Sequence, residues 1–260
     1  VAAQAKHIAS PERVRAFLHN FAAQQGWNDR DFTNEIERAI QRAYCMGQQL
    51  RDHNQQSAPS HLPPSKLPTP KPSRTKFTWP DFDQAAFDLH AQHDPLFDLD
   101  PIEIDPTEVM RALYHSDDLL CMALDIRSAI TQPLRLWRGT EAAMQFIVAN
   151  PMFDNIGLTQ EGKLSFRCHG NATRSRNYQV VEFDRGTPEQ QAGILSSLHS
   201  EDVPLVLVVW SGGKSMHGWF DVRDLEETEK QTFFGEAVRL GADASLWDQC
   251  KLVRMPGGRR

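Results

Sequence analysis

The sequence predicts an α+β domain that follows a small helical unit. From residue 146 onward, candidate strands and helices alternate in the order strand–helix–strand–strand–helix–strand. Three apolar segments, at 178–184, 204–210 and 216–222, have the composition of buried strands. A strong helix start at Thr187-Pro188 lies between the first two of them. This order favours a sheet with its helices packed on one face.

Local signals place each of these elements. Thr187 is a typical N-cap residue, Pro188 suits the first helical position, and Gln190 would close a capping box. Residues 211–215 are expected to form a hairpin-type turn between two strands. We expect a second helix that is capped by Asp224 and Glu227 and ends at Gly241. The remaining expected strands are 146–148, 164–167 and 251–255.

Composition divides the chain into three parts. Apolar residues recur at helical spacing within 9–50, which predicts a helical unit over residues 1–53. Residues 54–80 are rich in Pro, Ser, Thr and Lys and contain no acidic residue, so we expect an extended linker. Residues 81–260 form the main domain, with further helices expected at 82–92, 106–114 and 140–145. The chain stops soon after its last predicted strand, and we expect the domain to be truncated at its C-terminus.

Charge and hydropathy exclude some classes of protein. The 260 residues carry a net charge of −6, are 40% hydrophobic and have a mean hydropathy of −0.51. No apolar run approaches the roughly 20 residues that a membrane span needs, so we expect no membrane association. The four scattered cysteines form no CxxC motif, which argues against a zinc knuckle and favours reduced thiols in the cytoplasm.

The net negative charge is unevenly distributed. Residues 81–118 contain eleven Asp or Glu and one Arg, a local charge of −10, which leaves the remainder at about +4. The binding of a polyanion depends more on the local electrostatic field than on the net charge of the protein, so the net charge does not exclude a nucleic-acid partner. Three arginines, Arg167, Arg174 and Arg176, are candidate contacts to a template backbone.

Two carboxylates lie near the end of the strand predicted at 178–184. Glu182 and Asp184 are two residues apart, so they share one face of the strand, with Cα atoms roughly 6.6–6.8 Å apart. Phe183 and Val181 would then point into the core. Carboxylates that converge in this way suit one hard cation or a pair of cations. The simpler alternative is a polar strand face in contact with solvent.

A glycine turn with a lysine lies about thirty residues further on, in Ser211-Gly212-Gly213-Lys214-Ser215-Met216-His217. It is no Walker A loop, because Val208 stands where the first glycine is required and a strand follows instead of a helix. Backbone N–H groups at Gly212 and Gly213, with Lys214, would still suit a nucleotide phosphate. His217 shares a strand face with Ser215 and is a candidate phosphate or water ligand.

Two further positions complete the candidate site. Arg254 precedes a Met-Pro-Gly turn at a strand end, where a guanidinium can bind phosphate oxygens. Asp243 follows the helix that ends at Gly241 and is a candidate third carboxylate. Asp221 and Asp248 compete with it for that role.

These motifs together resemble the archaeo-eukaryotic primase superfamily, especially the primase-polymerases of phages, plasmids and mobile elements. That family has an acidic pair on a strand, then a Ser-x-His motif, then a single acidic residue. Here the pair resembles Glu182-Phe183-Asp184, the second motif Ser215-Met216-His217 and the third Asp243. The Arg254-Met255-Pro256-Gly257 segment is similar to one that follows in many relatives. The resemblance covers roughly 145–260, and its first acidic position is Glu where Asp is commoner.

The resemblance implies an RRM-like primase palm with an added α/β subdomain. It implies nucleotidyl transfer on a single-stranded DNA template, with or without a primer, using NTP or dNTP substrates. Glu182, Asp184 and Asp243 would hold two Mg²⁺ or Mn²⁺ ions, and His217 would act beside them. Nucleotide contacts would come from Ser211, Gly212, Gly213, Lys214, Ser215, His217 and Arg254. A replicative helicase is a candidate partner in replication or repair.

Two other functions compete with this hypothesis. One is a palm that positions a template for a helicase or nuclease without catalysis. The other is a nicking replication initiator, which would need paired histidine ligands and a catalytic tyrosine. His217 has no histidine near it in the sequence, so this third hypothesis is the weakest.

Overall fold

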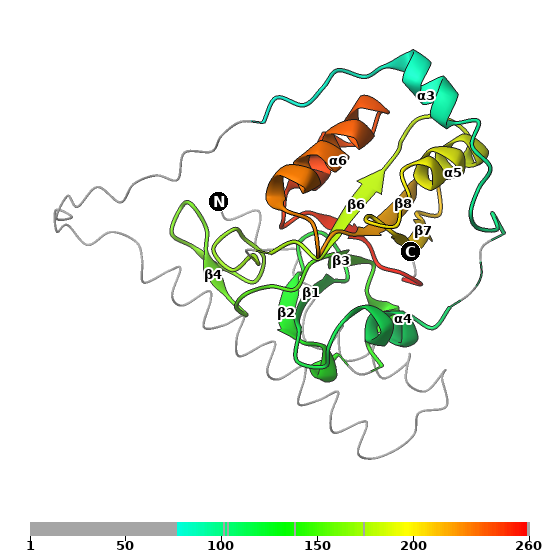
Figure 1. The fold of residues 1–260 in the computed structure, drawn as a ribbon. Helices are drawn as coiled ribbons and strands as arrows, with labels where there is room; N and C mark the ends of the chain where they lie inside the picture. The colour runs from blue at the N-terminus through cyan, green and yellow to red at the C-terminus, as the bar shows by residue number, and fades with distance from the viewer. Residues whose placement is uncertain (1–76, 101, 103, 138, 174, 259–260) are drawn as a thin grey trace, which may run out of the picture. The chain divides into compact units, whose positions relative to one another are not determined.

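A computed structural model of the chain describes residues 77–258 apart from 101, 103, 138 and 174 (Figure 1). The predicted helical unit at 1–53, nearly all of the linker at 54–80, and Arg174 lie outside the described residues. The described part is a mixed α+β structure with antiparallel sheets, as the sequence predicts at that level.

A three-stranded sheet carries both sequence signatures. It consists of β6 (Tyr178–Glu182), β7 (Leu205–Trp210) and β8 (Met216–Asp221), in the order β6-β8-β7 with antiparallel neighbours. An isolated bridge between Phe183 and Ala242 adds a short fourth segment beside β6. The strand predicted at 178–184 is present, but it ends at Glu182, because the Glu182–His217 pair is the last one between β6 and β8.

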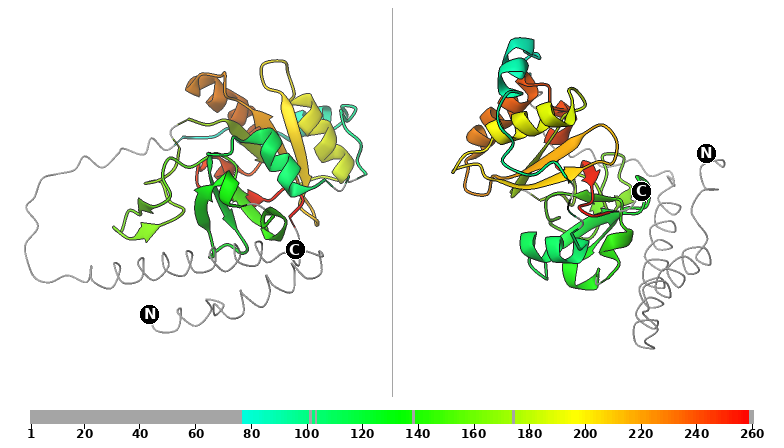
Figure 2. Two further views of the ribbon diagram at one scale, coloured as in Figure 1. Left: turned by 90° about the horizontal axis from the view of Figure 1, so that it is seen from below. Right: turned by 90° about the vertical axis from the view of Figure 1, so that its right-hand side faces the viewer.

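Two helices cover one face of this sheet, as Figure 2 shows. They are α5 (Pro188–Ser197) and α6 (Glu227–Arg239). A Cβ on Gly218 of β8 would lie 2.5 Å from a Leu195 methyl of α5. The ring centres of Phe220 and of Phe233 in α6 are 4.9 Å apart. Gly218 and Phe220 therefore face the helices. His217, which alternates with them, faces the other side.

The starts of the helices test the capping predictions. The capping box at Thr187 is present, with Pro188 in the first turn and Gln190 bonding back to the N-cap. The prediction for α6 is wrong by a residue or more: its N-cap is Glu226, which forms a capping box with Glu229. Gly241, at φ 98°, comes just after the helix, where a left-handed residue ends it readily.

A four-stranded sheet forms the second part of the core. Its strands are β1 (Leu119–Ala123), β2 (Ile130–Pro133), β3 (Phe146–Val148) and β9 (Leu252–Arg254), in the order β2-β1-β3-β9. The predictions for β3 and β9 are confirmed, with β9 shorter than expected. The sequence does not predict β1 and β2. The short pair β4 (Gly157–Leu158) and β5 (Leu164–Ser165) replaces the longer strand expected at 164–167.

The remaining helices are short. The predicted helices at 82–92 and 106–114 are present as α3 (Gln84–His90) and α4 (Pro106–Leu113). The segment expected at 140–145 is one turn of 3-10 helix, η3 (Glu141–Ala143). Two further 3-10 turns are η2 (Leu134–Leu136) and η4 (Ala244–Trp247). No helix among the described residues is long and apolar enough to cross a membrane.

Hydrogen bonds join the two main sheets at the start of β6. The Asn150 side chain accepts from the backbone N–H groups of Asn177 and Tyr178 and donates to the Tyr178 carbonyl at 2.8 Å. The Tyr178 hydroxyl donates to the Leu113 carbonyl at 2.8 Å, and its ring packs on Tyr114. The Tyr178 end of β6 is thus anchored against the rest of the domain, and Glu182 lies at the opposite end.

Candidate functional site

Glu182, Ser215 and His217 meet at the end of the three-stranded sheet. The Ser215 hydroxyl donates to Glu182 Oε1 at 2.8 Å, although the two residues are 33 positions apart. His217 is the direct cross-strand partner of Glu182, and its Nε2 lies 3.3 Å from the same oxygen. The structure therefore brings the first residue of the acidic pair, Glu182, together with the Ser-x-His motif, on the sheet face away from α5 and α6.

The Glu182 carboxylate is held in its charged form. Burial by itself raises the pKa of this carboxyl, but His217, Ser215 and the charge of Lys251 outweigh it, and the net shift is downward. The side chain is 21% exposed, so solvent reaches one side of the group. An ionised carboxylate that is partly open to solvent is a suitable ligand for a hard cation.

His217 is buried without a full set of partners. Its side chain is 5% exposed, and neither ring nitrogen has a hydrogen-bond partner among the described residues, since the contact to Glu182 lacks hydrogen-bond geometry. A buried polar atom that is left unpaired costs about 1–3 kcal/mol. Such atoms in a folded protein call for a specific reason, and a ligand that binds at this point would supply one.

Asp243 joins the site through the backbone. Its N–H donates to the Glu182 carbonyl at 3.0 Å, next to the Phe183–Ala242 bridge. Its carboxylate accepts from Ser245 and lies 4.0 Å from the Lys251 ammonium. Lys251, a neighbour of both Glu182 and Asp243, is a site residue that sequence reasoning missed, because only the fold brings it beside them.

The structure separates the three candidates for the third carboxylate. Asp221 pairs across the sheet with Tyr178, four residues from Glu182 along β6, or about 13 Å away, and is bound by Arg223. Asp248 lies beside His169. Asp243 alone of the three is adjacent to Glu182.

Asp184 lies just beyond β6 and is exposed. Its neighbours Val181 and Phe183 are fully buried, as predicted. The oxygens of Glu182, Asp184 and Asp243 fit Mg²⁺ or Mn²⁺ in ligand chemistry. They do not form a closed ligand set: in the described part of the chain, the one group of three or more metal-binding side chains with ligand atoms within 4.8 Å is His169, Asp248 and Cys250.

The predicted turn at 211–215 is present. The Ser211 N–H donates to the Ser215 carbonyl at 2.9 Å, and Gly212 has φ 77°, which favours glycine. The Ser211 hydroxyl accepts from the Ser215 N–H at 3.2 Å. Gly212, Gly213 and Lys214 are exposed. The turn thus presents backbone and one ammonium to solvent beside Glu182.

Gln191 of α5 connects the two signatures and was not predicted. Its amide nitrogen donates to the carbonyls of Arg185 at 3.1 Å and Lys214 at 2.9 Å, and its oxygen accepts from the Met216 N–H at 2.9 Å. The side chain is fully buried. Its sequence signal was weak: a glutamine next to the capping residue Gln190 in an otherwise ordinary helix.

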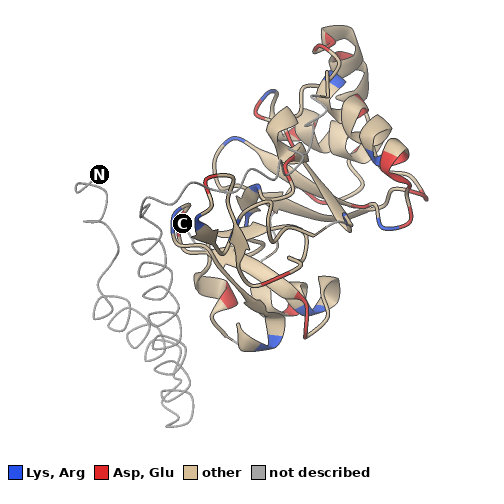
Figure 3. Ribbon diagram, turned by 90° about the vertical axis from the view of Figure 1, so that its left-hand side faces the viewer, with Lys and Arg blue, Asp and Glu red and all other residues tan. Residues whose placement is uncertain are grey.

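The predicted arginines have different environments. Arg254 is on β9 of the four-stranded sheet, with its guanidinium 4.7 Å from the centre of the Phe146 ring. Arg167 is partly buried and donates to the Cys250 carbonyl at 2.8 Å. In Figure 3 basic and acidic positions are interspersed along the described ribbon.

The proposed template contact at Arg176 is wrong. This side chain is only 4% exposed, stacks 3.9 Å from the Trp247 ring centre and donates to the Trp247 carbonyl and to Gln179. Burial lowers its pKa to about 10. A guanidinium that is used internally in this way cannot reach a phosphate backbone, so Arg176 has a structural role.

Comparison with protein-family models, with curated proteins and with solved structures gave no match. The functional assignment therefore depends on the residues of the site.

Proposed function

We propose that residues 81–260 form a catalytic domain for metal-dependent, template-directed nucleotidyl transfer of the primase-polymerase type. One observation carries the proposal: Glu182, Ser215 and His217 share contacts within 3.3 Å, and Asp243 is bonded to the Glu182 backbone. These residues come from the three motifs that define the archaeo-eukaryotic primase resemblance. Motifs that are distant in sequence but adjacent in space are what a composite active site requires.

The connectivity of the three-stranded sheet supports the same proposal. Strand β6, helix α5, strands β7 and β8, and helix α6 lead to the bridge at Ala242, with the spatial order Ala242 segment–β6–β8–β7. This order matches the β-α-β-β-α-β arrangement of ferredoxin-like folds, with the last strand represented by one bridge, and so supports an RRM-like palm. Fold alone does not assign an activity, which depends on the side chains of the site.

The residues would divide the work as follows. Glu182, Asp184 and Asp243 would hold Mg²⁺ or Mn²⁺, which when bound lowers the pKa of an attacking hydroxyl and stabilises charge on a phosphoryl group. Ser211, Lys214 and Ser215 would bind the triphosphate of an incoming NTP or dNTP. His217 Nδ1, which has no hydrogen-bond partner among the described residues, would bond to a phosphate oxygen or an ordered water. Arg254 would contribute a guanidinium from the neighbouring sheet.

A priming and extension assay tests the proposal. The protein is incubated with single-stranded DNA, Mg²⁺ or Mn²⁺, and labelled NTPs or dNTPs, with and without a primer. We expect template-dependent products from the wild type and none from Asp184→Ala. Asp202→Ala is the matched control, because both aspartates are exposed but Asp202 lies in the loop between α5 and β7.

Three outcomes are informative. Wild-type protein that makes no product under all metal and nucleotide combinations contradicts the proposal. So does an Asp184→Ala variant as active as Asp202→Ala. Template binding without nucleotide incorporation would instead support the non-catalytic alternative, a palm that positions nucleic acid for a helicase or nuclease.

A further inference from the structure

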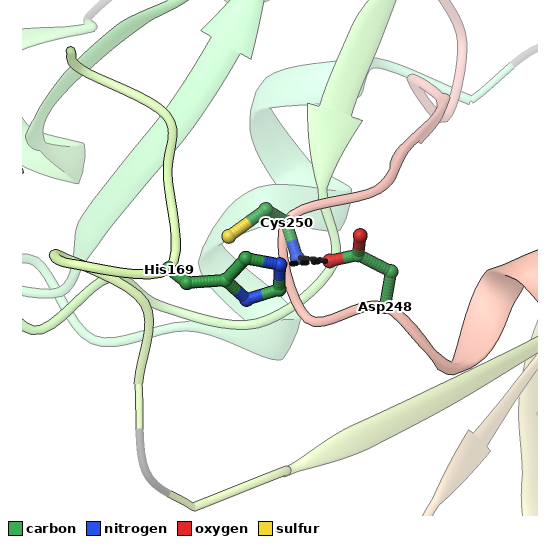
Figure 4. A group of neighbouring side chains, drawn as sticks. All are labelled: His169, Asp248 and Cys250. Carbon is green, nitrogen blue, oxygen red and sulfur yellow. Dashed lines mark hydrogen bonds and ion pairs between the residues drawn. The ribbon is translucent and has the colours of Figure 1, made fainter. Parts of the chain in front are cut away.

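Figure 4 shows a second group of potential metal ligands, none of which belongs to the site around Glu182. His169, Asp248 and Cys250 each offer one ligand atom, and these atoms all lie within 4.8 Å of one another. His169 Nε2 is 3.6 Å from Asp248 Oδ1. Asp248 Oδ1 also accepts from the Cys250 N–H at 2.8 Å, which fixes the carboxylate beside the thiol.

The loop that presents His169 is firmly built. Asn171 is fully buried, and its amide nitrogen donates to the carbonyls of Asp154 and Phe166 while its oxygen accepts from the Cys168 N–H. A Cβ on Gly170 would lie 2.5 Å from the Leu158 carbonyl oxygen, so this loop packs directly on the β4 backbone. Contacts with other parts of the fold therefore fix both chain neighbours of His169, Cys168 and Gly170, and with them the backbone of His169.

The chemistry of the three ligands selects one class of metal. Mg²⁺ and Mn²⁺ prefer oxygen, whereas a thiolate, an imidazole and a carboxylate together suit Zn²⁺. In a tetrahedral zinc site with bonds of 2.0–2.3 Å, ligand atoms are roughly 3.3–3.8 Å apart. The His169–Asp248 separation of 3.6 Å already falls in that range.

We propose that His169, Asp248 and Cys250 form a zinc site, with a water molecule in the fourth position. The side chains of His169 and Asp248 are about half exposed, at 48% and 45%, and they border an open pocket of about 410 Å³. The thiolate and the carboxylate supply two negative charges. These would balance the two positive charges of Zn²⁺, and the guanidinium of Arg167 lies close by, bonded to the Cys250 carbonyl.

The site would link two segments that are distant in sequence. His169 belongs to the loop after β5, whereas Asp248 and Cys250 immediately precede β9. Lys251 follows Cys250 and reaches Ser245 at 2.7 Å and Asp243 at 4.0 Å. A zinc ion would therefore fix the backbone that carries Lys251 next to the carboxylates of Glu182 and Asp243. The zinc site stands on its own residues and does not rest on nucleotidyl transfer.

Metal content and affinity test the proposal on the full-length protein. We expect one zinc per chain after purification, measured by mass spectrometry. A competition titration, in which the protein and a chromophoric chelator compete for added Zn²⁺ in excess Mg²⁺, should give one zinc-binding site per chain. Substitution by Co²⁺ should produce a thiolate-to-metal charge-transfer band. The Asp184→Ala variant should retain the zinc, which separates this result from any failure of the catalytic proposal.

Variants identify the ligands. His169→Ala changes an exposed residue and should weaken zinc binding at least about 10–100-fold, since even the partners of ligands contribute that much. Asp248→Asn keeps an oxygen for the Cys250 N–H but loses the charge, and should also weaken it. Cys250→Ser should abolish the Co²⁺ charge-transfer band. The control Asp202→Ala, an exposed residue in the loop between α5 and β7, should bind zinc as the wild type does.

Two results would overturn the site. One is wild-type protein that takes up no stoichiometric Zn²⁺ or Co²⁺. The other is a folded His169→Ala or Cys250→Ser variant, checked by circular dichroism, with unchanged zinc affinity.

Discussion

Gln191→Met should loosen the turn that carries Lys214. Methionine has a similar volume, but it cannot accept from the Met216 N–H or donate to the carbonyls of Lys214 and Arg185. The orphaned, buried Met216 N–H costs about 1–3 kcal/mol. Arg185 and Lys214 are exposed, so water replaces most of the other two bonds. We expect a total loss of roughly 2–4 kcal/mol in the free energy of unfolding.

Urea unfolding followed by tryptophan fluorescence measures this loss. For a domain of this size, about 3 kcal/mol corresponds to a fall in Tm of roughly 6–12 °C. Hydrogen exchange gives the local readout: the Met216 amide should exchange much faster in the variant. The matched control is Gln190→Met, one position earlier on α5, which removes only the capping contact to Thr187 and should cost about 1 kcal/mol. Equal losses in the two variants, or an unchanged Met216 exchange rate, would refute the role of Gln191.

Three further predictions concern packing, charge and the loop near the proposed zinc site. Gly193→Ala in α5 should destabilise the protein by about 1–3 kcal/mol in thermal melts, because its Cβ would lie 2.8 Å from a backbone oxygen. The control Gly235→Ala in α6 has no atom closer than 3.9 Å to its Cβ and should stabilise the protein by about 0.5–1 kcal/mol. In the folded state the pKa of Glu182 lies below its ordinary 4.5, so the stabilisation that its ionised form provides is present above pH 4.5 and is lost as the pH falls through the folded pKa. The Glu182→Gln variant should therefore lose less stability on acidification than the wild type does. An unchanged acid limb of the stability–pH curve would contradict this. Asn171→Ala should cost about 2–4 kcal/mol in urea unfolding, and a loss under 1 kcal/mol would show that its bonds are easily replaced.

The sequence predicted features that depend on a few neighbouring residues. The capping box at Thr187 needs only residues 187–190, and the turn at 211–215 needs only its glycines and flanking strands. Alternation along one strand correctly placed Val181 and Phe183 in the core. In each case the signal and the structure lie within the same short segment.

Features that depend on tertiary contacts were missed or wrong. Strand β2 has four residues and ends in proline, which is a weak strand signal. Strand β1 is an apolar run of five residues, and periodicity alone does not distinguish such a run from a buried helix segment. Arg176 looked like a surface charge, and only the position of Trp247 shows that it is buried. The sequence favoured Asp243 as the third carboxylate but left Asp221 and Asp248 as alternatives, and only the position of each residue relative to β6 separates them.

The position of Glu182, Ser215, His217 and Asp243 within a single β-α-β-β-α segment has an evolutionary consequence. This segment, residues 178–243, brings its own sheet, helices and turn to the site, and Tyr178 anchors it to the rest of the domain through Asn150 and Leu113. Substitutions in β1 reach the carboxylates only through the shared core, because Leu120 and Met122 belong to the same hydrophobic cluster as Val181 and Phe183. Homologues should accordingly diverge slowest from Tyr178 to Asp243 and fastest in the exposed loops outside this segment.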